Sequence, residues 1–172
     1  MTKQLRSLAL GLAAAVLVPV VSASAQGAAP AFGKGSKIVD LGIVTDPTGF
    51  GGGLEVGLLE LAPNLTLGVG GAASYQSESV LGADFSTTWI AGLANVHYSL
   101  PDLPALDLFA GAALGIIRFS GDGILGESVS NSDTGFGINL GARYMFTPKL
   151  GGVVRLGIED VPDLFLGVSI KF

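Results

Sequence analysis

The sequence predicts an all-β domain, an eight-stranded antiparallel barrel of up-and-down meander topology that crosses a membrane. Three observations carry this prediction. Apolar residues recur at every second position, glycine is scattered through the chain at 27 of 172 residues, and only 13% of residues are charged, against roughly 25% in an ordinary soluble domain. Beyond Val21 no segment keeps a helical period or an apolar run of roughly 18 residues, so membrane-spanning helices are not expected there.

The first residues have the layout of a secretory signal peptide. Lys3 and Arg6 precede an apolar stretch that ends at Val21, and an A-x-A site follows it. That stretch is about 14 residues long, short of the roughly 20 that a spanning helix needs, so we expect cleavage before Gln26. The chain then divides into a signal peptide (1–25), a flexible leader rich in glycine, alanine and proline (26–36) and a barrel domain (37–172).

Eight segments with period-two alternation follow, each bounded by glycine, proline, asparagine, aspartate or serine. We predict strands at 37–44, 51–61, 65–75, 88–100, 106–119, 134–146, 150–159 and 163–172. The connections after even-numbered strands are short, such as Ala62–Asn64. The loops after the third and fifth strands are longer, about ten residues near 76–85 and about thirteen near 120–133.

The less apolar face of the strands decides which side of the barrel faces outwards. Glycine and other small residues dominate this face, and small side chains suit the narrow interior of eight strands, whereas a soluble barrel would expose Lys, Glu and Gln there. The face also carries three acids and three bases, and balanced charge suits a closed interior because an unpaired buried charge is costly. We therefore predict that the apolar face contacts lipid. We also predict a lumenal charge network of Asp40, Glu55, Asp107, Arg143, Arg155 and Lys171.

Aromatic residues at the strand ends support the same orientation. Tyr98, Tyr144 and Phe146 lie near the short turns, where an interfacial girdle is expected. We expect both termini and the short turns to be periplasmic and the two longer loops to be extracellular. A bilayer offers no hydrogen-bond partners to a backbone edge, so the last strand must pair with the first.

The signal peptide, the eight strands and a last strand ending in Phe172 resemble the OmpA/OmpX-type family of small outer-membrane barrels. The resemblance implies a monomeric protein, integral to the outer membrane of Gram-negative bacteria and in contact with its lipid and lipopolysaccharide. It also implies that Phe172 belongs to the sorting signal read by the barrel-assembly machinery.

We expect a structural or envelope-integrity role with a plugged lumen, no catalytic residues, no cofactor and no metal. A narrow channel, or a conduit for small hydrophobic molecules, is the alternative from a transport class. An enzyme is a further alternative, because His97 and Ser99 resemble part of the motif of a lipid A deacylase family, although Leu100 replaces the asparagine expected after the serine. With 14 acidic and 9 basic residues a nucleic-acid partner is not expected, and without cysteine there is no disulfide or thiolate site.

Overall fold

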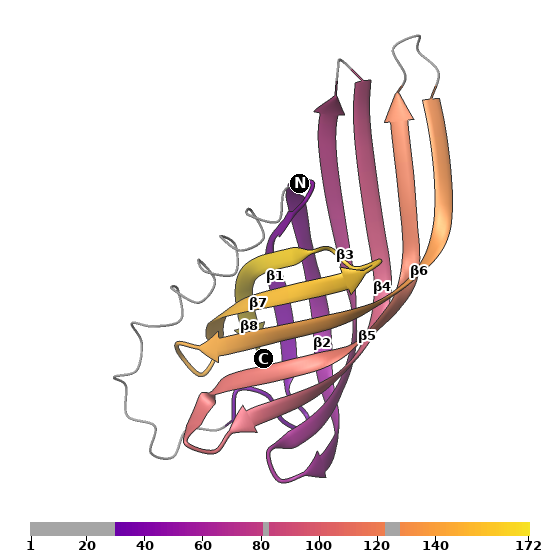
Figure 1. Ribbon diagram of the computed structural model, residues 1–172. Helices are drawn as coiled ribbons and strands as arrows, with labels where there is room; N and C mark the ends of the chain where they lie inside the picture. Colours follow the sequence, from indigo (N-terminus) through magenta and orange to yellow (C-terminus); the bar gives the residue numbers. More distant parts are fainter. Residues whose placement is uncertain (1–29, 81–82, 123–127) are drawn as a thin grey trace.

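A computed structural model describes residues 30–80, 83–122 and 128–172, and the predicted signal peptide lies outside them. Eight antiparallel strands follow one another as a meander and close into a barrel, as predicted (Figure 1). The strands are β1 (Lys37–Thr45), β2 (Gly49–Ala62), β3 (Leu65–Val80), β4 (Ala83–Leu100), β5 (Leu103–Asp122), β6 (Ser128–Met145), β7 (Leu150–Glu159) and β8 (Leu164–Lys171). Within the described ranges, no helix has the length and apolar character needed to cross a membrane.

The first and last strands close the barrel. They pair from Ile38 opposite Lys171 to Thr45 opposite Leu164. The backbone N–H of Phe172 then donates a hydrogen bond of 3.0 Å to the carbonyl of Lys37. Each strand of the barrel wall therefore has two neighbours, which leaves no open sheet edge facing lipid there.

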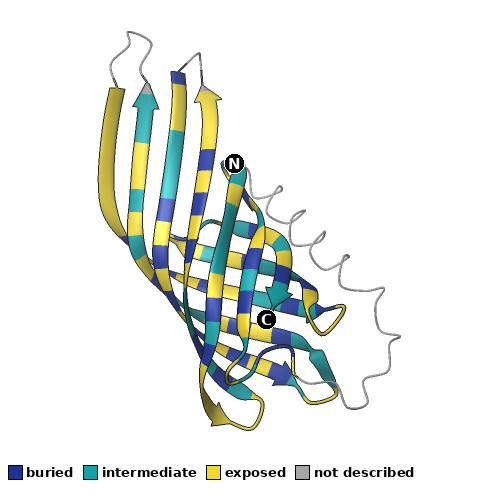
Figure 2. Cartoon of the chain, turned by 180° about the vertical axis from the view of Figure 1, so that it is seen from behind, coloured by how far each residue is buried: buried dark blue, intermediate teal, exposed yellow. Residues whose placement is uncertain are grey.

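The barrel is apolar outside, and its charged side chains point inside. On β1, Leu41 and Ile43 point outwards and are both 52% exposed. Asp40, the residue before Leu41, points inwards and is only 2% exposed. The other strands alternate in the same way, as the bands of buried and exposed residues in Figure 2 show. An apolar surface of this extent is unsuited to water and suits the acyl chains of a bilayer.

Glycines on the inner face let neighbouring strands approach closely. Gly70 of β3 lies opposite Glu55 of β2, and a Cβ atom at Gly70 would lie 2.0 Å from the carbonyl oxygen of Leu54. The next residue, Gly71, is exposed, and its Cβ would meet only the carbonyl oxygen of Ala91, at 3.5 Å. A side chain is therefore excluded at the inner position and tolerated at the outer one.

The two long loops predicted from the sequence are mostly strand. Only residues 81–82 separate β3 from β4, and only residues 123–127 separate β5 from β6. These four strands extend beyond the rest of the barrel (Figure 1), at what we call the extended end. The opposite end, with the β2–β3, β4–β5 and β6–β7 turns, is the turn end. Where a strand extends beyond a membrane, both of its faces meet water, so apolar and polar residues need not alternate. The ends of β3 to β6 therefore lack the period-two pattern, although their backbones remain paired.

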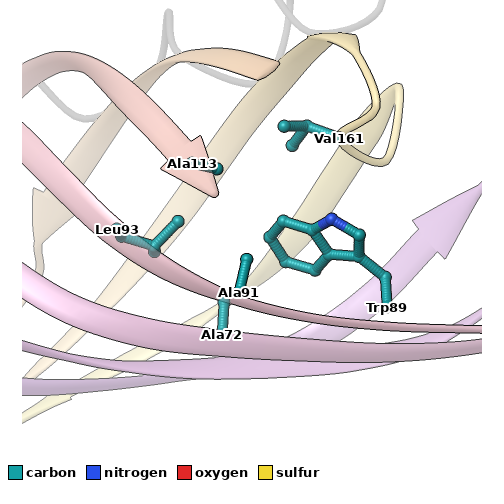
Figure 3. Close-up of a cluster of buried hydrophobic side chains, with 6 residues drawn as sticks. All are labelled: Ala72, Trp89, Ala91, Leu93, Ala113 and Val161. Atoms are coloured by element: carbon teal, nitrogen blue, oxygen red, sulfur yellow. The ribbon is translucent and has the colours of Figure 1, made fainter. Parts of the chain in front are cut away.

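An apolar cluster fills the lumen towards the extended end. It is made of Ala72, Trp89, Ala91, Leu93, Ala113 and Val161 (Figure 3). Val161 belongs to the β7–β8 loop, and the carboxylate of the preceding residue, Asp160, accepts a hydrogen bond of 3.0 Å from the N–H of Phe136. The loop is thereby held with Val161 against Trp89.

The segment before β1 contains buried residues where the structure describes it. Residues 30–36 enter the turn end of the barrel, and Ala31 and Phe32 are each only 2% exposed. Composition alone does not reveal this burial, because the aromatic partner of Phe32 lies in the lumen. The flexibility of the leader stays a prediction. Residues 26–29 of the predicted leader lie outside the described residues.

We expect Gly70→Ala to destabilise the barrel by at least about 1 kcal/mol, because the added methyl group would overlap the backbone of β2. Gly71→Ala, the adjacent control, should change the free energy of unfolding by less than about 0.5 kcal/mol. Urea titration in detergent micelles, read by the fluorescence of the single tryptophan, measures both values. Equal midpoints for the two variants would contradict the close approach of β2 and β3.

Candidate functional site

A cluster of buried charged side chains fills the lumen towards the turn end. Arg143 of β6 lies at its centre and is fully buried. Its guanidinium donates hydrogen bonds of 2.9 Å to Asp107 and 2.9 Å to Asp40, and its Nε donates one of 3.0 Å to Ser169. Glu55 Oε2 lies 3.7 Å from the same guanidinium. One cation therefore connects side chains from β1, β2, β5 and β8.

Asp40 is bonded through both of its carboxylate oxygens. Oδ1 accepts a hydrogen bond of 2.6 Å from Ser169, and Oδ2 accepts one of 2.9 Å from Arg143 and one of 3.1 Å from Arg155 of β7. The guanidinium carbon of Arg155 lies 5.3 Å from the ring centre of Phe165 and 5.8 Å from that of Phe109. These ring faces offer a favourable environment to a cation removed from water.

The single histidine of the chain belongs to this cluster. His97 of β4 is fully buried, with Nδ1 2.9 Å from Asp107 Oδ2 and Nε2 2.9 Å from Glu55 Oε1. Both contacts are hydrogen bonds when the ring carries two protons, since each nitrogen then donates. In that form the cluster contains three carboxylates and three cations, and its buried charge is balanced.

Strand β3 lies between Glu55 of β2 and His97 of β4, and a glycine on it leaves room for their contact. A Cβ atom at Gly68 of β3 would lie 2.9 Å from both Glu55 Oε1 and His97 Nε2, so glycine leaves room for the bond between them. Asn95 of β4 donates a further hydrogen bond of 2.7 Å to the same glutamate oxygen. Each of the eight strands thus supplies a member of the cluster or the room for one.

The structure brings five of the six predicted network residues together. They are Asp40, Glu55, Asp107, Arg143 and Arg155. Lys171 lies apart from their ion pairs, and its ammonium donates a hydrogen bond of 2.8 Å to the carbonyl of Pro30. His97 occupies the position of a third cation and supplies that charge when both ring nitrogens are protonated, which a charge count that treats histidine as neutral overlooks. The sequence signal that could have found it is the position of His97 on the lumenal face of β4, two residues after Asn95.

His97 and Ser99 do not form the contact that the enzyme hypothesis needs. Both are buried, both ring nitrogens of His97 bind carboxylates, and the hydroxyl of Ser99 donates to the carbonyl of Phe32 at 3.0 Å. Covalent catalysis needs a base bonded to the nucleophile. In the part of the chain that the structure describes, no group of three or more potential ligand side chains is placed to hold a metal ion.

The aromatic residues predicted for the membrane interface lie near the turn end. Tyr98 is 43% exposed and Phe146 is 58% exposed. Tyr144 is half-buried, with its ring centre 5.7 Å from that of Phe146. Phe172, the predicted sorting signal, is 74% exposed. Such positions suit the headgroup level of a bilayer, and the roles of girdle and sorting signal stay predictions.

Comparison with known proteins gives a match over most of the chain. Residues 10–164 match a family model described as the outer membrane protein beta-barrel domain. Ail, the attachment invasion locus protein of Yersinia pestis, has a similar structure, with a TM-score of 0.58 at 16% identity over 81% of this chain and 99% of Ail. The N-terminal β-barrel domain of OprF from Pseudomonas aeruginosa has a TM-score of 0.55 at 18% identity, over 82% of this chain and 100% of that domain. At such identities the likeness to solved structures concerns the fold alone. No curated protein sequence matches the chain.

We expect Arg143→Met to destabilise the barrel by about 3 kcal/mol or more, because it leaves buried carboxylates without their shared cation. Arg118→Met makes the same chemical change at an exposed position on β5 and should cost less than about 0.5 kcal/mol. Urea midpoints in detergent micelles compare the two variants. If both variants unfold at the wild-type midpoint, the cluster does not stabilise the fold.

Proposed function

The chain belongs to the outer membrane protein beta-barrel family, and from this premise we propose that it serves a structural, envelope-integrity role with a closed lumen. Membership places the protein in the outer membrane as an integral barrel. The observation that carries the proposal is the packing of the lumen. Side chains occupy it at successive levels between Phe32 at the turn end and the apolar cluster that contains Val161 of the β7–β8 loop.

Three successive layers support the closed lumen. Phe32 lies at the turn end, the cluster around Arg143 comes next, and the apolar cluster around Trp89 lies towards the extended end. The space between Trp89 and Arg155 measures about 20 Å³, enough for roughly one water molecule and far too small for a hydrated ion. Passage through the middle layer would break buried ion pairs, at a cost of about 3–5 kcal/mol for each partner removed.

The proposed topology follows from the two ends of the barrel. The turn end faces the periplasm, because its connections are short, and the extended end faces the outside of the cell. The exposed leucine, isoleucine, valine and phenylalanine side chains contact lipid and lipopolysaccharide, with the protein as a monomer. A cleaved signal peptide and recognition of Phe172 by the barrel-assembly machinery complete the proposal.

A ligand of one relative is a poor guide to this chain. One structure of Ail contains the heparin analogue sucrose octasulfate and has a TM-score of 0.59 to this chain. Within 76–85 and 116–134, the sequence of the extended end has a single base, Arg118, and five acids, which are Glu78, Asp84, Asp122, Glu127 and Asp133. The whole chain has a formal net charge of −5, so the field around it repels polyanions. We therefore do not include sulfated sugars among its proposed ligands.

The purified barrel should give no steady conductance above the lipid background in planar bilayers, because its lumen is packed. A gel run with and without boiling verifies that the inserted protein is folded, since folded barrels change mobility on heating. Reproducible unitary conductance would favour the narrow-channel alternative over the structural one.

Lipid A from cells that produce the protein should have the same acyl composition as lipid A from cells that lack it. His97 and Ser99 lie inside the lumen and bind other partners, so they have no access to lipid. Mass spectrometry of extracted lipid A makes the comparison. A loss of acyl chains that requires the protein and disappears with Ser99→Ala would instead establish the deacylase alternative.

A further inference from the structure

The segment before β1 enters the barrel through a passage that glycines provide. Its backbone first continues the β1 ladder, since the N–H of Gly57 donates to Ser36 at 2.9 Å and the N–H of Gly35 donates to Gly57 at 2.8 Å. Gly35 has a φ of 82°, which glycine adopts without steric cost. A Cβ atom at Gly57 would lie 2.0 Å from the carbonyl oxygen of Gly33. The wall of the barrel therefore has the shape that this segment requires.

Hydrogen bonds from three other parts of the barrel hold the segment. The N–H of Ala31 donates to Pro104 of β5 (2.7 Å), Ser99 of β4 donates to the carbonyl of Phe32 (3.0 Å), and Lys171 of β8 donates to the carbonyl of Pro30 (2.8 Å). Recognition of an extended peptide commonly combines main-chain hydrogen bonds with one side-chain pocket. The same combination occurs here within one chain.

The side-chain pocket suits an aromatic ring. The ring of Phe32 stacks on the imidazole of His97, with 3.8 Å between ring centres and 22° between the planes. The guanidinium carbon of Arg143 lies 5.8 Å from the centre of the Phe32 ring, and the ring of Phe109 lies 5.3 Å from that of His97. An aromatic face interacts favourably with both neighbours, which an aliphatic side chain of similar size cannot do. Phe32 also covers the charge cluster and shields its carboxylates from water.

We propose that the turn end of the lumen is a binding pocket for one aromatic side chain, and that residues 30–36 occupy it in cis as a stopper. This goes beyond the proposed structural role, because the stopper precedes β1 and the β1–β8 pairs that close the wall do not include it. Its partners lie on β2, β4, β5 and β8. The stopper consequently docks only when the strands on both sides of the β1–β8 seam are already in place.

Nuclear magnetic resonance of the single histidine tests the stacking directly. Because the chain has one histidine, the carbon-bound ring protons of His97 give one set of signals, which the ring current of Phe32 shifts upfield. Phe32→Leu should move these signals downfield in the folded protein, whereas Phe146→Leu, a change at an exposed ring, should leave them in place. Unchanged His97 signals in folded Phe32→Leu would overturn the proposal.

Thiol labelling tests the docking of the backbone without relying on Phe32. The chain has no cysteine, so Ala31→Cys and Lys34→Cys each introduce a single thiol, one at a buried and one at an exposed position of the stopper. In folded protein the thiol from Ala31→Cys should react with a water-soluble maleimide at least roughly tenfold more slowly than that from Lys34→Cys, because it reacts only through local opening. Adding Gly57→Ala to Ala31→Cys should remove most of this protection, since the methyl group meets Gly33. Equal rates for the two single variants would mean that the segment is not docked.

Both measurements are independent of the conductance test. A barrel that conducts while the His97 signals and the thiol protection are as expected would refute the closed lumen and retain the aromatic pocket. A silent barrel without stacking or protection would refute the stopper and leave the closure to the two inner layers.

Discussion

The fold depends on one buried cation that cannot be left without its partners. Arg143 is removed from water inside the barrel, where its charge is tolerated only with carboxylates at hydrogen-bond distance. Asp107 is its direct neighbour across the β5–β6 ladder, whereas Asp40 reaches it from β1 on the other side of the lumen. A slip of any of these strands by one residue would turn a charge towards lipid. The ion pairs therefore select a single register for the wall.

The same constraint explains the distribution of small residues. Strands that tilt around a narrow lumen approach one another closely, and charged side chains occupy much of the interior. Gly68 shows the consequence, since its missing side chain is the space in which Glu55 and His97 meet. The outer face has no such limit, and bulky apolar side chains such as Leu114 cover it. Small residues and charges inside the barrel and bulky apolar residues outside it thus both follow from a narrow closed barrel in lipid.

Several features escaped sequence reasoning for physical reasons. The polar ends of β3 to β6 were expected to be loops. Period-two alternation arises where one face of a strand contacts lipid, and it disappears where both faces meet water. Lys171 was expected in the charge network because the acid and base counts match, and the count omits a histidine that can carry charge. Residues 30–36 lack any period, yet Phe32 is buried, because its partner His97 lies 65 positions away in the chain. The composition of residues 30–36 therefore gives no information about the pocket on the barrel that binds Phe32.

The sequence by itself determined the number of strands, the closed barrel and the direction in which each apolar face points, because these follow from local alternation and from the inability of lipid to bond a strand edge. It also identified the face on which the charged residues lie. The tertiary structure alone decided which of them meet, since stagger between tilted strands brings together residues as distant as Asp40 and Arg155. It likewise decided that Phe32 stacks on His97 at one end of the lumen and that Val161 packs with Trp89 towards the other. These contacts join residues that are far apart in the sequence, so no local pattern predicts them.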